Sequence, residues 1–269
     1  MRGSRGRPPV LKRFGQHFLH DQTVLAAIAE AASPADDDVI VEIGPGRGAL
    51  TDLLAQRPNR LIAVEIDRAL SESLRGRYAG NPNVSIVEQD VLQVDIAALA
   101  GGPFVVVGNV PYYITTPILF HVLRPPYPQH AVFLVQREVA ERIVAGPGSK
   151  TYGALSANVQ AVASAEIIRL VPPGAFRPPP KVDSAVVRVV PRADPIISTE
   201  EVAPYRGFVQ ALFGMRRKQI GNSLRSASQL TAGATAAVLS GLGMDPTARA
   251  ESLSPGELAT LMRASRRSG

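Results

Sequence analysis

Residues 39–54 read VIVEIGPGRGALTDLL, an apolar run that stops at a glycine-rich turn and continues as a helical pattern. Glycine tolerates positive φ and lets a ligand approach the backbone closely. In open α/β sheets, ligands bind at the carboxyl ends of central strands. The stretch therefore predicts a strand over residues 39–43, a helix that starts near Ala49, and a ligand site at the turn between them.

Further apolar runs rich in β-forming residues alternate with helical patterns along the chain: LIAVEI (61–66), VSIVEQ (84–89), FVVVGN (104–109) and AVFLVQ (131–136). Such runs are typical of strands covered on both faces, and their alternation with helices indicates a parallel sheet built from βαβ units. Two later runs, 165–171 and 184–190, flank the loop PPGAFRPPPK, and we expect them to pair antiparallel at the sheet edge. The prediction is a doubly wound, mostly parallel, Rossmann-like α/β domain.

The character of the chain changes to helices after PRADP, with Gly and Pro at the joints. We predict a small all-helical domain over residues 197–269, a main domain over 13–196 and a flexible basic arm over 1–12. The helices expected in the last domain cover 199–213, 216–227, 232–241 and 255–264.

Composition limits the class of protein. Hydrophobic residues make up 45% and charged residues 19% of the 269 residues, as in a soluble globular protein, and no apolar run approaches the roughly 20 residues that span a membrane. With no Cys and no HExxH pattern among its four histidines, a metal-free protein is expected. The N-terminus lacks the apolar core of a secretory signal, and its basic stretch is short and rich in Gly and Pro, which disfavours an organelle transit peptide. We therefore expect the cytoplasm. We expect a monomer.

The basic charge lies at the two ends of the chain. Residues 1–13 carry five basic and no acidic side chains, and residues 205–269 carry nine basic and three acidic ones, within a net charge of +6. The middle of the chain is therefore net acidic. A solvated surface is the plain interpretation, but charge gathered at both ends favours contacts with a nucleic-acid backbone.

Two acidic residues follow the glycine turn at strand ends. Glu65 ends the next predicted strand, where a carboxylate can accept hydrogen bonds from both ribose hydroxyls, and Asp90 follows the third. This pattern suits a nicotinamide dinucleotide or S-adenosylmethionine. The loop is not GxGxxG, and Pro45 removes an N–H that could bind a pyrophosphate. With Gly44 and Gly46, the loop resembles the E-x-G-x-G-x-G motif of the class I methyltransferases.

The run FVVV ends in GNVPYY (108–113). If the cofactor supplies a methyl group, the N6 amine of adenine needs two acceptors on its N–H bonds to become nucleophilic. The Oδ1 atom of Asn109 and the carbonyl of Val110 can serve, since Pro111 biases Val110 toward an extended conformation. Tyr112 then offers a ring on which the base can stack.

The proline-rich loop supplies candidate RNA contacts. An adenine in a duplex cannot enter such a pocket, so the target base must be extruded or single-stranded. We predict that Phe176 stacks on the other face of the base and that Arg177 and Lys181 bind phosphates. A loop aromatic packed on the core is the competing interpretation for Phe176.

Together these segments resemble the ribosomal RNA adenine dimethyltransferases, and within them the small-subunit branch linked to kasugamycin sensitivity. The resemblance extends over nearly the whole chain, in RFGQHFLHD (13–21), VEIGPGRGALT (41–51), VEID (64–67), GNVPYYITTPILFHVL (108–123), FRPPPKVDSAVVR (176–188), RRKQIGNSL (216–224) and GLGMDPTARAESLSPGEL (241–258). It implies N6,N6-dimethylation of two adjacent adenosines in the 3′-terminal hairpin loop of 16S rRNA, within a partly assembled small ribosomal subunit.

The resemblance also implies site residues. His17 and Leu19 would contact S-adenosylmethionine along with Gly44, Glu65, Asp90 and Asn109. Relatives usually carry Asn at the position of His17 and Leu at that of Val110, and neither change should abolish activity because His can donate a hydrogen bond and Val110 acts through its backbone. Arg216, Arg217 and Lys218 are predicted to bind rRNA phosphates, against the alternative of a solvated helix face.

Three other functions compete. A large-subunit (23S) rRNA adenine dimethyltransferase of the macrolide-resistance type shares the glycine loop and the N-x-P-Y motif, but the block over 241–258 favours the small-subunit enzyme. A non-catalytic assembly or transcription factor on the same scaffold is disfavoured by the intact Asn109, Pro111 and Tyr112, although an assembly role is compatible with catalysis. A dinucleotide-dependent oxidoreductase is disfavoured by the loop sequence.

Overall fold

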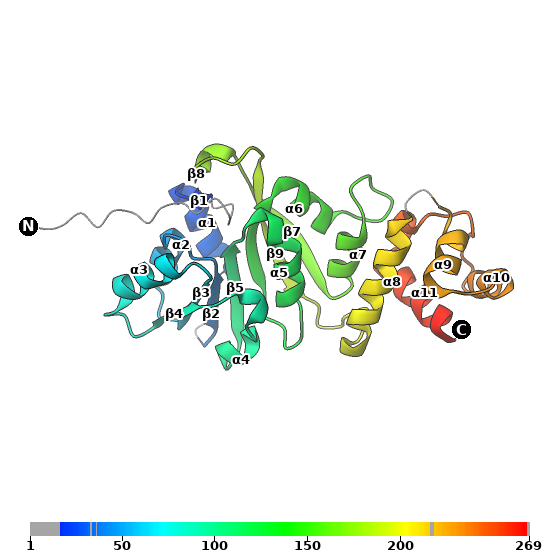
Figure 1. Ribbon diagram of the computed structural model, residues 1–269, viewed down its shortest axis with the longest axis horizontal. Helices are drawn as coiled ribbons and strands as arrows, with labels where there is room; N and C mark the ends of the chain where they lie inside the picture. The colour runs from blue at the N-terminus through cyan, green and yellow to red at the C-terminus, as the bar shows by residue number, and fades with distance from the viewer. Residues whose placement is uncertain (1–16, 33, 36, 216–217, 268–269) are drawn as a thin grey trace, which may run out of the picture. The chain divides into compact units, whose positions relative to one another are not determined.

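The computed structural model describes residues 17–32, 34–35, 37–215 and 218–267 (Figure 1). Its main sheet has seven strands in the order β4-β3-β2-β5-β6-β9-β7. The strands are β2 (Val39–Ile43), β3 (Leu61–Glu65), β4 (Val84–Glu88), β5 (Phe104–Asn109), β6 (Ala131–Gln136), β7 (Ala163–Val171) and β9 (Ser184–Pro191). A separate two-stranded sheet pairs β1 (Phe18–Leu19) antiparallel with β8 (Phe176–Arg177).

The five strands from β4 to β6 are parallel, and β9 runs antiparallel to β6. All five residues of the central strand β2 are buried. Its neighbours β3 and β5 start level with it, since Ile40 pairs with Leu61 and Val39 with Phe104, so the polar ends of these strands meet at one edge. The predicted mostly parallel, doubly wound α/β fold is confirmed.

The two edges of the sheet differ from its centre. β4 lies at one edge, where none of its residues is buried. The expectation that the run at 84–89 is covered on both faces was therefore wrong: an edge strand has a partner on one side only, and its apolar residues are half-buried. At the other edge, β7 is the neighbour of β9, so the two late runs do pair at the sheet edge as predicted.

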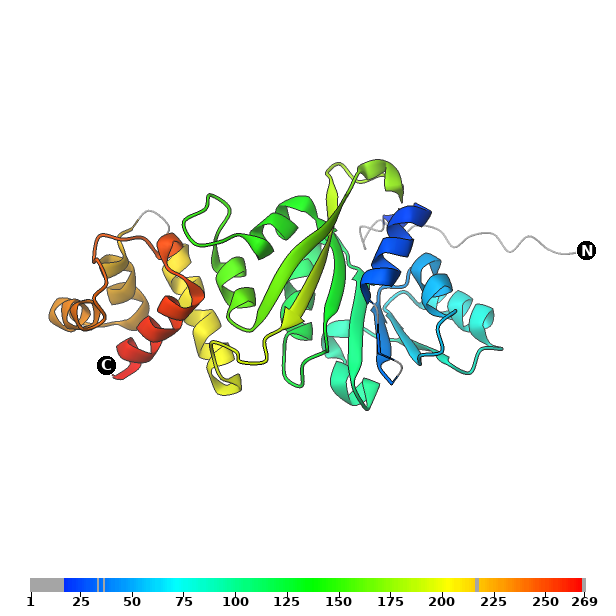
Figure 2. The same cartoon turned by 180° about the vertical axis from the view of Figure 1, so that it is seen from behind.

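Helices cover both faces of the sheet. In Figure 1, α5 (Thr115–Val122) lies in front of the strands, whereas α1 (Gln22–Ala32) lies in front in the reverse view of Figure 2. α1 packs on β5 and β6, α3 (Arg68–Tyr78) on β3 and β4, and α4 (Ile96–Ala100) on β2. The connections are completed by α2 (Ala49–Leu54), η2 (Val91–Gln93), η3 (Tyr112–Ile114) and η4 (Pro173–Ala175). Residues from α1, β2 and β5 form one apolar core beneath the strand ends.

The chain divides into two compact units, one of residues 1–140 with 166–190, the other of 141–165 with 191–269. The second unit holds α7 (Ala154–Gln160), η5 (Thr199–Glu201), α8 (Val202–Gly214), α9 (Ile220–Ser228), α10 (Ala232–Gly241), η6 (Ala250–Ser252) and α11 (Pro255–Arg267), and α6 (Arg137–Val144) crosses the boundary. Buried Tyr205 of α8 donates to the carbonyl of Pro255, and Tyr152 to that of Leu253. The helices predicted at 232–241 and 255–264 are present.

Residues 141–165 are thus grouped with the C-terminal helices, and the domain boundary predicted near residue 197 stays a prediction. The predicted helix at 216–227 begins later, at Ile220, after Gln219 in an extended conformation. Within the described residues, no helix is long and apolar enough to cross a membrane.

Candidate active site

A cavity opens in the first unit at the carboxyl ends of β2, β3, β4 and β5. It is lined by the glycine loop, by the residues that follow β3 and β4, by the stretch 109–114, and by residues 17–19 of the N-terminal segment. Parallel strands bring these turns to one edge of the sheet, as expected for a ligand site of an open α/β sheet.

The glycine loop requires glycine at its centre. Gly44 and Gly46 have φ of 67° and 59°, a conformation that other residues rarely adopt. A Cβ atom added to Gly46 would lie 3.2 Å from the ring of Phe18. The loop therefore sits closely under the N-terminal segment, and a larger residue at Gly46 would push the two apart.

Glu65 ends β3 with a carboxylate whose two oxygens are both fixed. Its Oε2 accepts the N–H of Gly46 at 3.0 Å, and its Oε1 accepts the N–H of Asp67 at 2.9 Å. Burial raises the pKa of Glu65, and the backbone hydrogen bonds partly offset this. Because each carboxylate oxygen has a second lone pair, Glu65 can accept two more hydrogen bonds from a ligand.

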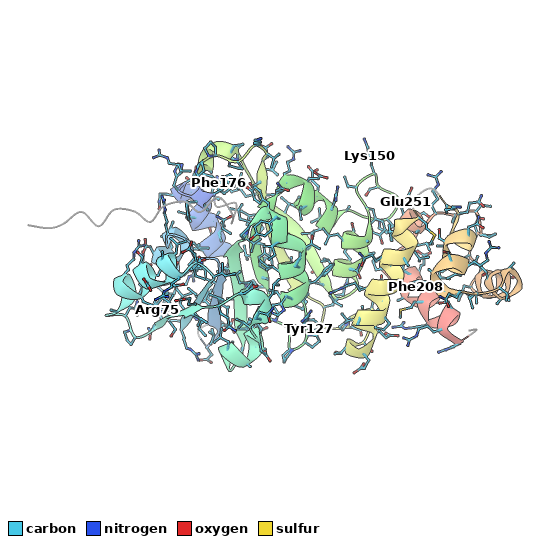
Figure 3. The ribbon with its side chains drawn as sticks, viewed as in Figure 1. Arg75, Tyr127, Lys150, Phe176, Phe208 and Glu251 are labelled. Carbon is cyan, nitrogen blue, oxygen red and sulfur yellow. The ribbon has the colours of Figure 1, made fainter. Side chains whose placement is uncertain are left out.

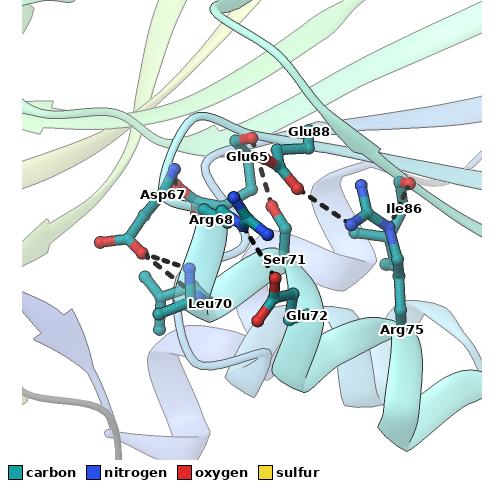
Figure 4. A network of polar contacts seen from close by, with 10 residues as sticks. Glu65, Asp67, Arg68, Leu70, Ser71, Glu72, Arg75, Ile86 and Glu88 are labelled. Carbon is teal, nitrogen blue, oxygen red and sulfur yellow. Dashed lines mark hydrogen bonds and ion pairs between the residues drawn. The ribbon is translucent and has the colours of Figure 1, made fainter.

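A network on α3 holds the turn around Glu65, as Figure 4 shows. Asp67 caps the helix by accepting the N–H groups of Ala69 and Leu70. Ser71 donates to the carbonyl of Glu65. Capping of this kind fixes the direction in which a strand enters its helix, so the orientation of the Glu65 side chain is set locally.

Asp90 lies two residues beyond β4 and also lines the cavity. Its Oδ1 accepts the N–H of Leu92 at 3.0 Å and thereby caps η2. The N–H of neighbouring Gln89 donates to the carbonyl of Glu65 at 3.0 Å. The two acidic turns predicted to act together are therefore joined through the backbone.

Asn109 is the last residue of β5 and faces the cavity. Its Nδ2 donates to the backbone carbonyl of His17 at 3.1 Å. This bond uses one of the two N–H groups of the amide and identifies that end as the nitrogen, so Oδ1 is the acceptor end. Val110, which follows, has a buried side chain, and Pro111 has φ of −57° and ψ of 135°.

Tyr112 begins η3 and is half-buried in the cavity wall. Its hydroxyl lies 2.6 Å from Oγ of Ser184, a buried residue on β9. Burial raises the pKa of the Tyr112 phenol, and the hydrogen bond to Ser184 partly offsets this. The ring of His17 stacks on it, with a centroid separation of 5.9 Å and an interplanar angle of 25°.

The N-terminal residues enter the site through the β1–β8 pairing, in which Phe18 lies opposite Arg177 and Leu19 opposite Phe176. His17 and Leu19 both line the cavity, and their predicted contact with S-adenosylmethionine stays a prediction. Nδ1 of His17 lies 2.8 Å from the carbonyl oxygen of Pro178. Because a carbonyl only accepts, this nitrogen is the donor.

The prediction that Phe176 stacks on the target base is not supported. Its side chain is 1% exposed and belongs to the apolar core with residues of α1 and β5; Figure 3 marks its place beside the N-terminal elements. The alternation of side chains along β8 turns Phe176 inward and leaves Arg177 exposed. The competing interpretation, an aromatic residue packed on the core, is therefore the one that fits Phe176.

The predicted phosphate-binding residues do not line the cavity. Arg177 is exposed on β8, Lys181 is exposed in the loop before β9, and Lys218 is exposed in the second unit. Arg216 and Arg217 lie outside the described residues. Among the described residues, no group of His, Asp and Glu side chains is arranged to hold a metal ion.

Sequence reasoning did not identify Glu42 as a site residue. This carboxyl lines the cavity and is 1% exposed, and its Oε2 atom has no hydrogen-bond partner among the described residues. Burial raises the pKa of Glu42 to about 8, and the nearby carboxylate of Glu65 adds to the effect. Its place as the first acid of E-x-G-x-G-x-G was the available signal.

Three other lining residues also escaped prediction. The guanidinium of Arg47 lies 4.3 Å from the centroid of the Phe18 ring, a cation–π contact. The apolar side chain of Ile66 is 51% exposed, and the aromatic side chain of Tyr113 is 65% exposed, although both are large. Exposed side chains of this type at a cavity mark a ligand surface, and only the folded structure shows that they share one.

Known proteins are similar to this chain over most of its length. The family model for ribosomal RNA adenine dimethylase matches residues 10–265. A ribosomal RNA small subunit methyltransferase A of Acidobacterium capsulatum is 42% identical over 98% of this chain and 98% of its own. One of Xanthomonas euvesicatoria pv. vesicatoria is 46% identical over 80% of this chain and 83% of its own.

Two solved structures share the architecture. The 23S rRNA methyltransferase ErmE is 30% identical, with a TM-score of 0.71, over 92% of this chain and 98% of its own. A dimethyladenosine transferase from Plasmodium falciparum, 24% identical, matches with a TM-score of 0.79 over 94% of this chain and 98% of its own, which shows the same fold. The sequence resemblance is confirmed, and the chain belongs to the ribosomal RNA adenine dimethylase family.

Proposed function

We propose that the protein transfers methyl groups from S-adenosylmethionine to the N6 atoms of two adjacent adenosines in the 3′-terminal hairpin loop of 16S rRNA. The observation that carries the proposal is the amide of Asn109, whose Nδ2 donates to the His17 carbonyl and whose Oδ1 is thereby left as an acceptor at the cavity wall. An acceptor is what the N–H bonds of an adenine amine require.

The charge of the cavity supports this cofactor over a dinucleotide. Among the described lining residues, Glu65 and Asp90 are acidic, Glu42 adds a buried carboxyl whose raised pKa keeps it largely protonated at neutral pH, and Arg47 is the permanent cation. Such a wall disfavours a pyrophosphate and favours a ligand that carries positive charge and no phosphate. When bound, S-adenosylmethionine supplies an electrophilic methyl group on a cationic sulfur.

The residues of the cavity divide the binding task. Glu65 would accept hydrogen bonds from the ribose hydroxyls, since its two oxygens are held by backbone N–H groups and keep a lone pair each. Asp90 would accept from the adenine amine of the cofactor. Gly44 and Gly46 let the ligand approach the backbone, while Leu19 closes the site from the N-terminal side.

On the target side, Asn109 and Val110 would accept from the N6 amine of the target adenosine, and Pro111 would keep the Val110 carbonyl in place. Tyr112 would support the base by stacking, worth roughly 1–3 kcal/mol. Chemistry of this kind rests on positioning and electrostatics. Oδ1 of Asn109 would act as a neutral hydrogen-bond acceptor. By accepting an N–H of the target N6 amine, it would orient the lone pair of that amine toward the methyl group.

The names and identities of the relatives support the small ribosomal subunit, rather than the large one, as the substrate. Two relatives that are 42% and 46% identical carry the small-subunit name, whereas ErmE, named for 23S rRNA, is 30% identical. We place the protein in the cytoplasm as a monomer that acts on 16S rRNA within a pre-assembled subunit. The exposed Arg177, Lys181 and Lys218, with Arg216 and Arg217, would contact phosphates.

The test is transfer of radiolabelled methyl groups to undermethylated small subunits, with large subunits of the same cells as the parallel substrate. Nuclease mapping and nucleoside digestion then locate and identify the product. We expect dimethyladenosine confined to the 3′ hairpin of 16S rRNA. Label in 23S rRNA would favour the macrolide-resistance type instead, and subunit binding without label would favour an assembly factor.

A further inference from the structure

His17 contacts two of the four residues that are assigned to the target side of the site, Tyr112 and Asn109. Its ring stacks on Tyr112, and its backbone carbonyl accepts the amide of Asn109. We propose that His17 is a positioning residue for the target adenosine, whose imidazole supports one face of the Tyr112 ring while the base stacks on the other. The inference rests on the proposed function and gives His17 a role different from that of a cofactor ligand.

The imidazole is held firmly enough to act as a support. Nδ1 donates to the Pro178 carbonyl at 2.8 Å, and the next residue, Phe18, is paired with Arg177 in the β1–β8 sheet. A ring that only filled the place of the base would have to leave on substrate binding and break these contacts. The structure therefore favours a permanent stack.

The Tyr112 ring is restrained in two ways. Its hydroxyl lies 2.6 Å from Oγ of the buried Ser184, and His17 covers one face. Phe176, the aromatic residue expected to complete a sandwich around the base, is buried in the core. The stack His17–Tyr112–adenine thus replaces the predicted order Tyr112–adenine–Phe176.

The two contacts of His17 can be separated by substitution. The carbonyl that accepts the Asn109 amide belongs to the backbone and remains in every variant. Replacing the side chain therefore removes the stack and the Pro178 hydrogen bond, and His17→Phe restores a ring without the Nδ1 donor. His20→Ala is the matched control, because His20 is exposed and absent from the cavity wall.

The experiment compares wild type, His17→Ala, His17→Phe and His20→Ala in three measurements: S-adenosylhomocysteine affinity by calorimetry, affinity for undermethylated small subunits by filter binding, and kcat with KM for methyl transfer. An aromatic stack contributes enough for about a 3- to 10-fold effect. We expect His17→Ala to lower kcat by about that factor with S-adenosylhomocysteine affinity within about 2-fold, and His17→Phe to recover most of the loss.

Other results overturn the inference. A large loss of S-adenosylhomocysteine affinity in His17→Ala, with kcat unchanged at saturating cofactor, would make His17 an ordinary cofactor ligand. Tighter subunit binding in His17→Ala would show that the ring occupies the place of the base. If the wild type labels 23S rRNA, the proposed substrate is wrong and the same variants are compared on that RNA; no label on either subunit overturns both proposals.

Discussion

The two sides of the cavity are held together in different ways. On the cofactor side, Asp90 and Asp67 cap the helices that directly follow them, and Glu65 binds a loop 19 residues away. On the target side, Asn109 is oriented by His17, 92 positions earlier, and Tyr112 by Ser184, 72 positions later. One side is fixed by its own turns, and the other only by the completed fold.

Substitutions on the two sides of the cavity should affect different steps. Damage to the cofactor side should weaken ligand binding and be overcome by more cofactor. Damage to the target side should slow transfer even when cofactor is saturating, because the groups that orient the amine are lost.

Asn109→Ala should have the largest effect. Loss of a preorganised group that orients the reacting atoms should lower kcat by about 100- to 1000-fold. Initial rates on undermethylated small subunits at saturating cofactor measure it. The control is Asn83→Ala, which alters an exposed turn asparagine before β4; a comparable loss there, or none in Asn109→Ala, would contradict the assignment.

Glu65→Ala should weaken S-adenosylhomocysteine binding by about 10- to 100-fold, because two hydrogen bonds to a charged acceptor disappear. Calorimetry gives the affinity directly. Glu72→Ala, on the exposed face of α3, is the matched control and should bind as wild type. Wild-type affinity in Glu65→Ala would remove Glu65 from the cofactor site.

The raised pKa of Glu42 predicts that the stability of the folded protein depends on pH. Its pKa is raised to about 8 in the folded protein, so the unfolded chain gives up this proton at lower pH than the folded one. The free energy of unfolding of the wild type should therefore fall, relative to Glu42→Gln, as pH rises from about 4.5 to about 8, by on the order of a few kcal/mol.

Urea unfolding at several pH values measures this difference, with the exposed Glu30→Gln as control. Equal slopes for wild type and Glu42→Gln would show that the carboxyl is already ionised in the folded protein. Addition of S-adenosylmethionine should reduce the slope if its positive charge lies close to Glu42.

Ser184→Ala should have the smallest effect. It removes the partner of the Tyr112 hydroxyl and should lower kcat by about 2- to 10-fold. Tyr112→Phe removes the same hydrogen bond from the other side, so the double variant should lose little beyond either single one. Additive losses in this cycle would show that Ser184 and Tyr112 act independently.

The same contrast explains what could be predicted from the sequence. The parallel strands and the residues Gly44, Glu65 and Asp90 follow from short-range patterns, and all three residues line one cavity. Asn109 and Tyr112 could be named from their motif. Their supports could not, because no local pattern indicates that His17 stacks on Tyr112 or that Ser184 meets its hydroxyl.

The errors have the same origin. Phe176 reads as a loop aromatic, but strand pairing with Leu19 turns it into the core. The run at 84–89 reads as a covered strand, but its place in the sheet order leaves β4 at an edge. In both cases the deciding neighbour is distant in sequence, so periodicity and composition carry no signal of it.

The most direct test of the separation is single-turnover methyl transfer into undermethylated small subunits, measured for Glu65→Ala and Asn109→Ala over a range of cofactor concentrations. We predict that the rate of Glu65→Ala approaches that of wild type at saturating cofactor, within about 3-fold, while Asn109→Ala remains at least about 100-fold slower. If both variants reach the wild-type rate at saturating cofactor, or if neither does, the assignment of one side to cofactor binding and the other to methyl transfer is contradicted.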